Sequence, residues 1–372
     1  MFISTLSMME GHSMAGYIIL LALGILLVIK GGDWFVDAAS WIAEVSGIPS
    51  FIIGATIVSV ATTLPEILVS SISAAQGQAS MAIGNAVGSV NCNIALIMAT
   101  SIVFTAPSFS RKNYAAKMCI LLATIALLWG LSSNGEFTWW NAVLVLAMFV
   151  IFLVENLLSA KKHSKLLEAE QKDAVVEQKE YGSGVLRYYF DKKEAQKIVL
   201  KKTGMVIERK DIAKNIVLFI VGAGAIFCGA QLMSDNGAAF ARALNVPEGI
   251  IGVTILAIGT SLPEFVTAIT AIIKKKSDLS VGNIIGANII DLSLILPLCT
   301  FIQFGKFGTF LPVDAQSLTI DFPFCIAVCG FALIPAFIMG KFKKWQGALL
   351  LAGYLTYVVL LILNTIGTIA IF

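Results

Sequence analysis

The chain has few charged residues and only two histidines for its length. Asp, Glu, Lys and Arg make up 13% of its 372 residues, whereas hydrophobic residues make up 58%. Too little polar surface remains to cover a soluble globule. His12 and His163 both lie outside the apolar runs, which excludes a Ser–His pair or a His-based zinc site inside a membrane. We therefore expect an all-α integral membrane protein that is not an enzyme.

Two further absences narrow the interpretation. Residues 1–13 contain no Lys or Arg, so they lack the basic start of a cleaved signal peptide, and we expect the first apolar run to be retained. The cysteines all lie within apolar runs and have no metal-ligand spacing, which favours small apolar packing. No resident cofactor and no nucleic-acid partner are expected.

Long apolar runs are what the sequence does have. A helix that crosses a bilayer needs about 20 apolar residues, and the sequence contains ten runs of suitable length. We expect ten transmembrane helices at about residues 15–38, 47–75, 79–106, 114–133, 138–158, 211–235, 246–273, 279–304, 318–340 and 346–371.

Positive charge is concentrated in alternate loops. Half of all Lys and Arg residues lie in the hydrophilic segment 160–210, and other clusters follow the third, seventh and ninth runs. Lys and Arg stay on the cytoplasmic side of a membrane. We therefore expect a multi-pass protein of the cell membrane with the 160–210 loop in the cytoplasm and both termini outside.

The two halves of the chain repeat one another at a constant offset of 198 residues. Leu64-Pro65-Glu66 aligns with Leu262-Pro263-Glu264, and Gly84-Asn85 aligns with Gly282-Asn283. Five spans separate equivalent points, and an odd number reverses the direction of crossing. We expect two inverted five-helix repeats, at residues 1–159 and 211–372, joined by the linker 160–210. Secondary transporters use this architecture, with a binding site at the repeat interface.

Each repeat places a proline and a glutamate inside an apolar run, in "ATTLPEIL" and "AIGTSLPEFV". Pro65 and Pro263 have no N–H, so each leaves a helix carbonyl without its partner, and hydroxyl side chains precede both prolines. Glu66 lies one turn beyond Thr62, and Glu264 one turn beyond Thr260, so carboxylate and hydroxyl share a helix face. Ionisable residues deep in a span are costly and usually functional.

The following run of each repeat adds a second set of polar residues, in "GNAVGSVNCN" and "GNIIGANIID". Ser89 and Asn93 are four residues apart, as are Ala287 and Asp291. Carboxylates, hydroxyls, carbonyls and an amide form an all-oxygen set that suits hard cations such as Ca²⁺ and Na⁺. Glu155, by contrast, is expected to reach the membrane interface beside Lys161.

These motifs closely resemble the two α-repeats of the sodium/calcium exchanger family, prokaryotic type, within the cation/calcium exchanger superfamily. The resemblance implies an antiporter that exchanges Ca²⁺ for Na⁺ by alternating access, with the first and sixth spans sliding as a gating pair. It places the central calcium ligands at Glu66 and Glu264, beside Thr62 and Thr260. The remaining residues that it implies for the sodium sites and the middle of the cluster are Thr63, Ser261, Ser89, the carbonyls of Ser59 and Ala257, Asn93 and Asp291.

Three positions depart from the family pattern. Ala61 replaces a glycine, and Val90 stands where the second repeat has Asn288. Ala287 lacks the hydroxyl of Ser89, its mate, where the mate of a residue is the one at the equivalent position of the other repeat, 198 residues away. The last removes one expected sodium ligand, so a Ca²⁺/H⁺ antiporter of the same superfamily remains the alternative. A passive calcium channel is a further alternative, because acidic rings also line pores. The expected partners are Ca²⁺, the coupling ion and the lipid bilayer, and the sequence indicates no oligomeric state.

Overall fold

The computed structural model describes residues 14–46, 48–106, 111–180, 197–199, 206–243 and 257–365. In this part of the chain, eight helices are long and apolar enough to cross a membrane, or nine if a pair bent by 46° counts as one span. The chain is therefore a helical membrane protein, as predicted. The predicted span 246–273 begins outside the described residues and continues in two short helices.

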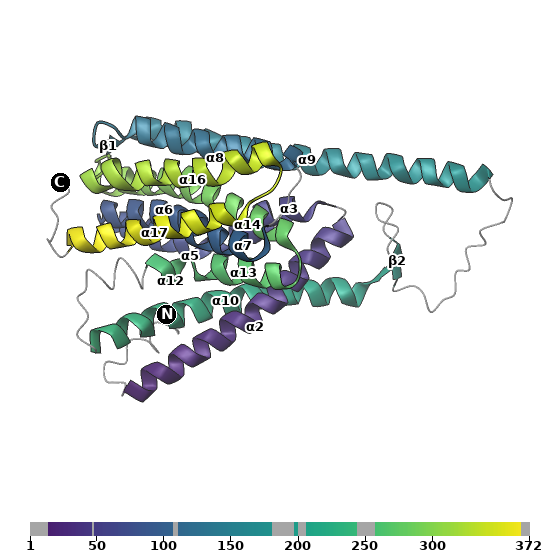
Figure 1. The fold of residues 1–372 in the computed structure, drawn as a ribbon, viewed down its shortest axis with the longest axis horizontal. Coiled ribbons are helices and arrows are strands. Elements are labelled where there is room, and N and C mark those ends of the chain that lie inside the picture. The colour runs from purple at the N-terminus through teal and green to yellow at the C-terminus, as the bar shows by residue number, and fades with distance from the viewer. Residues whose placement is uncertain are drawn as a thin grey trace.

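Helical segments account for most of the first half. The element bounds are α2 Met14–Ser46, α3 Ser50–Ile53, η1 Gly54–Val58, α4 Ser59–Thr62, α5 Leu64–Ala75, α6 Ala79–Cys92, η2 Asn93–Met98, α7 Ala99–Thr105, α8 Arg111–Leu131 and α9 Trp139–Glu180, where η marks a π-helix. The 42-residue helix α9 runs on into the segment predicted as a linker and extends past the other helices (Figure 1).

The described part of the second half is also helical. Its bounds are α10 Arg209–Ala243, α12 Ala257–Thr260, α13 Leu262–Ile273, α14 Ser277–Ile290, η5 Asp291–Ile295, α15 Leu296–Phe307, η6 Ser317–Asp321, α16 Phe322–Met339 and α17 Lys344–Thr365. Two short antiparallel pairs complete the described structure: β1 Glu136–Phe137 with β4 Leu311–Pro312, and β2 Lys197–Val199 with β3 Val206–Glu208.

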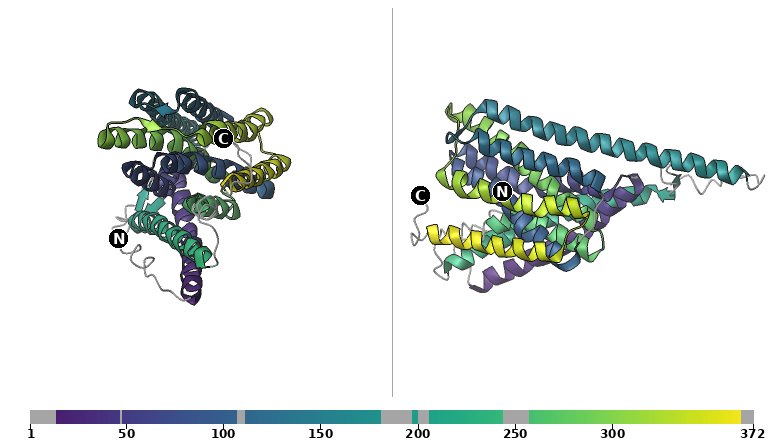
Figure 2. Two further views of the ribbon diagram at one scale, coloured as in Figure 1. Left: turned by 90° about the vertical axis from the view of Figure 1, so that its left-hand side faces the viewer. Right: turned by 45° about the horizontal axis from the view of Figure 1, so that its top comes forward.

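The helices α2 and α10 pack against each other as a pair beside the remaining bundle (Figures 1 and 2). Glycines make this contact possible. A Cβ atom on Gly24 would lie 2.9 Å from the Gly229 carbonyl oxygen, and one on Gly31 would lie 2.8 Å from that of Gly222. Small residues let helix backbones approach closely where lipid provides no hydrophobic driving force.

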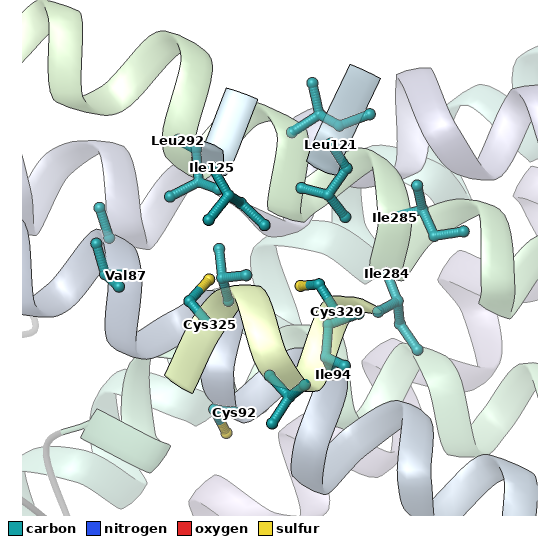
Figure 3. Packing of buried hydrophobic residues seen from close by; sticks show 14 of the residues in the cluster. Val87, Cys92, Ile94, Leu121, Ile125, Ile284, Ile285, Leu292, Cys325 and Cys329 are labelled. Atoms are coloured by element: carbon teal, nitrogen blue, oxygen red, sulfur yellow. The ribbon is translucent and has the colours of Figure 1, made fainter. Parts of the chain in front are cut away.

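The rest of the bundle surrounds a buried apolar core. Helices α6, α8, α14 and α16 contribute side chains such as Val87, Leu121, Ile284 and Cys325, which lie together in Figure 3. Many large apolar side chains point outwards instead, among them Leu157 and Leu355, which are 70% and 66% exposed. An apolar outer surface is expected of a protein whose solvent is lipid.

Candidate functional site

Both Pro-Glu motifs interrupt a helix at the same place. Helix α4 ends at Thr62 and α5 begins at Leu64, with Thr63 between them at φ −82° and ψ 0°. In the second half, α12 ends at Thr260 and α13 begins at Leu262, with Ser261 at φ −86° and ψ 6°. The prolines lack the N–H that would continue each helix. Each proline therefore lies just after a helix break, and the two breaks have matching backbone angles.

Three carboxylates lie buried near these breaks. Glu66 and Glu264 are each 1% exposed, and Asp291 is fully buried. Both oxygens of Glu66, both oxygens of Asp291 and one oxygen of Glu264 accept no hydrogen bond from the protein. The three groups interact electrostatically with one another. Buried carboxylates without partners are costly, so this arrangement calls for a positively charged ligand.

Hydrogen bonds connect the two breaks across the halves of the chain. Thr63 Oγ1 donates to Glu264 Oε1 at 3.3 Å. Thr62 Oγ1 donates to Asn283 Oδ1 at 3.3 Å, and Thr260 Oγ1 donates to Asn85 Oδ1, also at 3.3 Å. The last two bonds join mated residues in reciprocal order, since Thr260 and Asn283 lie 198 positions after Thr62 and Asn85. Each half therefore supplies an asparagine that accepts a hydrogen bond from the threonine at the helix break of the other half.

Asn93 and Asp291, at mated positions, each begin a π-helical segment, η2 and η5. The Nδ2 atom of Asn93 donates to Asn288 Oδ1 at 2.9 Å, which joins the two helices across the halves. Single π-turns within α-helices frequently occur at functional sites, because they redirect side chains and free backbone groups. The second polar set predicted from the sequence therefore lies on irregular backbone.

The other predicted site residues are mostly buried in the same region. Ser59 is fully buried, and its carbonyl oxygen already accepts from the Thr63 N–H and the Thr62 hydroxyl. Ser89 and Ser261 are 2% and 1% exposed, and the Ser89 hydroxyl has no hydrogen-bond partner in the protein. Ala257 is the first residue of α12.

Sequence reasoning missed several polar residues of this region. Asn85, Asn283 and Asn288 accept the hydrogen bonds that join the halves, and the repeat alignment already matched Asn85 with Asn283. Asp321 was also missed. It is 4% exposed and accepts a 2.9 Å hydrogen bond from the Tyr357 hydroxyl. Its position inside the ninth apolar run was the available signal.

Glu155 has a partner that the sequence did not predict. Its Oε2 lies 2.6 Å from the Nζ of Lys117, a side chain that is fully buried. The Ser159 hydroxyl donates to the other carboxylate oxygen at 2.7 Å. A buried ammonium requires a counter-charge. Glu155 on α9 supplies this counter-charge to Lys117 on α8.

A cavity of about 740 Å³ reaches the helix breaks from one side of the bundle. Pro65, Asn85 and Thr260 are among its lining residues, and Asp235 and Asp321 contribute acidic groups to its walls. Among the described residues, no three His, Cys, Asp or Glu side chains lie close enough together to hold a metal ion. A cation bound near the helix breaks would therefore need hydroxyl, amide and carbonyl oxygens in addition to carboxylates, which is how hard cations are coordinated.

Comparisons with known proteins agree on one family. The profile of the family described as "Sodium/calcium exchanger protein" matches residues 16–158 and 214–363. The sodium/calcium exchanger MaX1 of Methanosarcina acetivorans is 30% identical over 363 residues, covering 92% of this chain and 97% of that protein. An uncharacterised membrane protein of Methanocaldococcus jannaschii is 28% identical, covering 90% of this chain and 94% of its own length.

Solved structures of the sodium-calcium exchanger NCX_Mj have the same fold. The form soaked with 2.5 mM Na⁺ and 10 mM Sr²⁺ superposes with a TM-score of 0.72 at 24% identity, covering 93% of this chain and 99% of the other. The form soaked with neither Na⁺ nor Ca²⁺ gives a TM-score of 0.70 at 26% identity, covering 93% and 98%.

Proposed function

Because the chain belongs to the sodium/calcium exchanger protein family, we propose that it is an antiporter that exchanges Ca²⁺ for Na⁺ across the cell membrane. The observation that carries this proposal is the group of buried, unpartnered carboxylate oxygens on Glu66, Glu264 and Asp291. Charge of this kind buried in a membrane protein marks an ion pathway. The family match favours sodium over protons as the coupling ion.

We assign Ca²⁺ to Glu66 and Glu264, whose two negative charges match one divalent ion, with Thr62 and Thr260 beside them. Desolvating a divalent cation requires nearby formal charge, because neutral oxygens recover too little of the lost hydration. The hydroxyls of Thr63, Ser89 and Ser261 and the carbonyls of Ser59 and Ala257 are proposed to line flanking Na⁺ sites. Asn93 and Asp291 complete the middle of the cluster.

Two inverted five-helix repeats, and thus ten spans, are part of the proposal. Three features at mated positions support it: the angles at Thr63 and Ser261, the reciprocal Thr–Asn hydrogen bonds, and positive φ values of 77° at Gly77 and 59° at Lys275. The charge distribution places the 160–210 segment, with the outer part of α9, in the cytoplasm and both termini outside.

Alternating access is supported by a difference between mated glycines. A Cβ atom on Gly282 would collide with the Phe51 carbonyl oxygen, and one on Gly286 would lie 2.6 Å from Ala55 Cα. Their mates Gly84 and Gly88 line the cavity, with no other residue within 4 Å of such an atom. One side of the site is therefore sealed while the other is open. On the proposed topology, the open side faces the exterior.

The test uses proteoliposomes containing the purified chain. Vesicles loaded with Na⁺ are diluted into Na⁺-free medium with labelled Ca²⁺, and the assay is repeated with only a pH gradient. Uptake should follow the Na⁺ gradient. Uptake driven by the pH gradient alone, or equal uptake without any counter-ion, would overturn the assignment in favour of proton coupling or a channel.

A further inference from the structure

Lysines in the turn between α13 and α14 hold the end of α2. Lys274 Nζ lies 2.7 Å from Asp37 Oδ1 and 3.4 Å from Asp33 Oδ1, and it donates to the Asp33 carbonyl oxygen at 2.9 Å. Lys276 Nζ lies 2.8 Å from Glu44 Oε1. Asp33, Asp37 and Glu44 all belong to α2, the helix that pairs with α10. Two lysines therefore tie this helix pair to the bundle through three acidic residues.

These ion pairs lie on the sealed side of the site. Lys276 immediately precedes α14, the helix whose Gly282 and Gly286 pack without a gap against Phe51 and Ala55. In the same region, Leu279 is fully buried and packs in a cluster with Phe35 and Val36 of α2. Closure of this side thus combines tight packing with ionic contacts.

The mated turn on the open side has the same backbone but no charge. Gln76, Gly77 and Gln78 stand where the second half has Lys274, Lys275 and Lys276. The hydrogen bonds of the two turns correspond: Gln78 N donates to Ser73 O at 2.9 Å, and Lys276 N donates to Ala271 O at 2.7 Å. The geometry of the turn is therefore kept in both halves, while the positive charges occur in one.

The acidic partner, in contrast, is present on both sides. Asp235 of α10 is the mate of Asp37, and it lies in the cavity wall. In this conformation it accepts hydrogen bonds from its neighbour Gln231, the mate of Asp33, at 3.0 Å to each carboxylate oxygen. If the halves exchanged conformations, Asp235 would meet Gln76 instead of a lysine. The residues of that turn would supply no ion pair equivalent to Lys274–Asp37, and the nearest described lysine, Lys306, already donates to the Ala75 carbonyl oxygen.

We propose that Lys274 and Lys276 form an ionic latch on one side, which favours the conformation that is closed to the cytoplasm and open to the exterior. This proposal rests on the alternating access and topology proposed above. Because inverted repeats produce the opposite conformation by exchanging their shapes, any interaction without an equivalent in the other half biases the equilibrium between them. Partly exposed ion pairs are individually weak, so the latch sets a bias and does not block transport.

The test uses a reporter cysteine whose exposure differs between the two conformations. Leu279 is fully buried, whereas its mate Met81 is 50% exposed and lines the cavity. A Leu279→Cys variant in inside-out vesicles with equal Na⁺ on both sides should react with an impermeant maleimide only while the cytoplasmic side is open. The chain with its native cysteines alone gives the background rate. Adding Lys274→Gln should raise the reporter's labelling rate about 1.5-fold to fivefold.

Lys275→Gln is the matched control. Lys275 is exposed and forms none of the ion pairs described here. Lys275→Gln therefore removes the same charge from the same turn without removing an ion pair. It should leave the rate unchanged. Asp37→Asn should raise the labelling rate as Lys274→Gln does. The double variant should raise the rate no further than either single variant, because both substitutions remove the same interaction. Gln76→Lys should lower the rate of the Met81→Cys reporter from outside, since it adds a latch on the other side.

An unchanged Leu279→Cys rate in the Lys274→Gln background, or an equal increase with Lys275→Gln, would overturn the latch. The proposed function is tested separately by Na⁺-driven Ca²⁺ uptake in the parent chain. Normal uptake without the labelling change rejects the latch alone, whereas absent uptake in a folded parent chain rejects the exchanger assignment.

Discussion

Glu66 and Glu264 occupy mated positions, whereas the mate of Asp291 is the neutral Asn93. The architecture already accepts an amide at the Asp291 level in one half, but both halves place a carboxylate beside the proline. A doubly charged ion needs both of these charges to offset its desolvation. The roles of the three buried acids should therefore differ in substitution experiments.

We predict that Glu66→Gln and Glu264→Gln each nearly abolish Ca²⁺ transport, because each keeps the side-chain shape but removes one of two matching charges. Asp291→Asn should keep substantial Na⁺-driven exchange. Labelled Ca²⁺ uptake into Na⁺-loaded proteoliposomes measures all three. An inactive Asp291→Asn protein together with a normal Glu66→Gln protein would show that the calcium ligands are wrongly assigned.

The missing hydroxyl at Ala287 gives a second prediction. Ala287 is fully buried, and its mate Ser89 has a hydroxyl without a hydrogen-bond partner. Ala287→Ser should lower the Na⁺ concentration for half-maximal exchange several-fold, since a single added polar contact contributes about 0.5–1.5 kcal/mol. Ca²⁺ affinity should change little. An unaltered Na⁺ dependence would remove Ala287 as a determinant of sodium binding.

Lys117 provides a prediction about stability. Its buried ammonium pairs with Glu155 and lies 5.5 Å from the centre of the Phe51 ring. Lys117→Met should destabilise the protein by about 3 kcal/mol, because it leaves a largely buried carboxylate without a counter-charge. The double variant Lys117→Met/Glu155→Leu should be more stable than the single variant in thermal unfolding of the detergent-solubilised protein. Equal stability of the two would mean that Glu155 is adequately solvated alone.

Among the elements, α6 and α14 have the same sequence pattern but different packing. Gly286→Ala would place a Cβ atom 2.6 Å from Ala55 Cα, so the helices would have to separate. We predict a loss of about 1–3 kcal/mol of stability from such overpacking. Gly88→Ala meets no neighbouring atom in this conformation, so it should fold normally.

Transport should nevertheless slow in Gly88→Ala, because Gly88 must take the place of Gly286 when the open side closes. Thermal unfolding and Ca²⁺ flux measured on the same preparations separate the two effects. Normal flux in Gly88→Ala would indicate that the two halves do not exchange their packing.

The sequence predicted where the helices are disturbed, because proline has a direct steric and hydrogen-bonding effect on the helix that contains it. It did not predict the π-helical segments at Asn93 and Asp291 or the sealed contact at Gly282, since these depend on the facing helix. It missed the Thr62–Asn283 bond for a similar reason. The offset shows which residues are equivalent, but not which of them meet across the halves.

At the level of the whole molecule, apolar run length and charge predicted the helical membrane class. They placed most span ends within a few residues, although α2, α9 and α10 are longer than their runs. The partner of Glu155 was not predicted, because a run of residues shows the depth of a side chain without showing its neighbour on another helix. Contacts between side chains on different helices depend on tertiary packing, so a single sequence does not show them directly.

Topology yields the last prediction. Lys179 lies near the end of α9, in the segment proposed to be cytoplasmic. Lys179→Cys should not react with an impermeant thiol reagent added to intact cells, and it should react after permeabilisation. Ready labelling from outside would reject the inverted orientation of the two halves.

The hydrogen bonds between Thr62 and Asn283 and between Thr260 and Asn85 also bear on how the protein is made. These partners are separated by 221 and 175 positions along the chain. During synthesis, the N-terminal helices enter the membrane before the C-terminal helices leave the ribosome. Thr62 and Asn85 must therefore wait for these partners until nearly the whole chain has been inserted. The assembled site is consequently a late product of folding, and a chain halted after its first half would lack every hydrogen bond that joins the two halves.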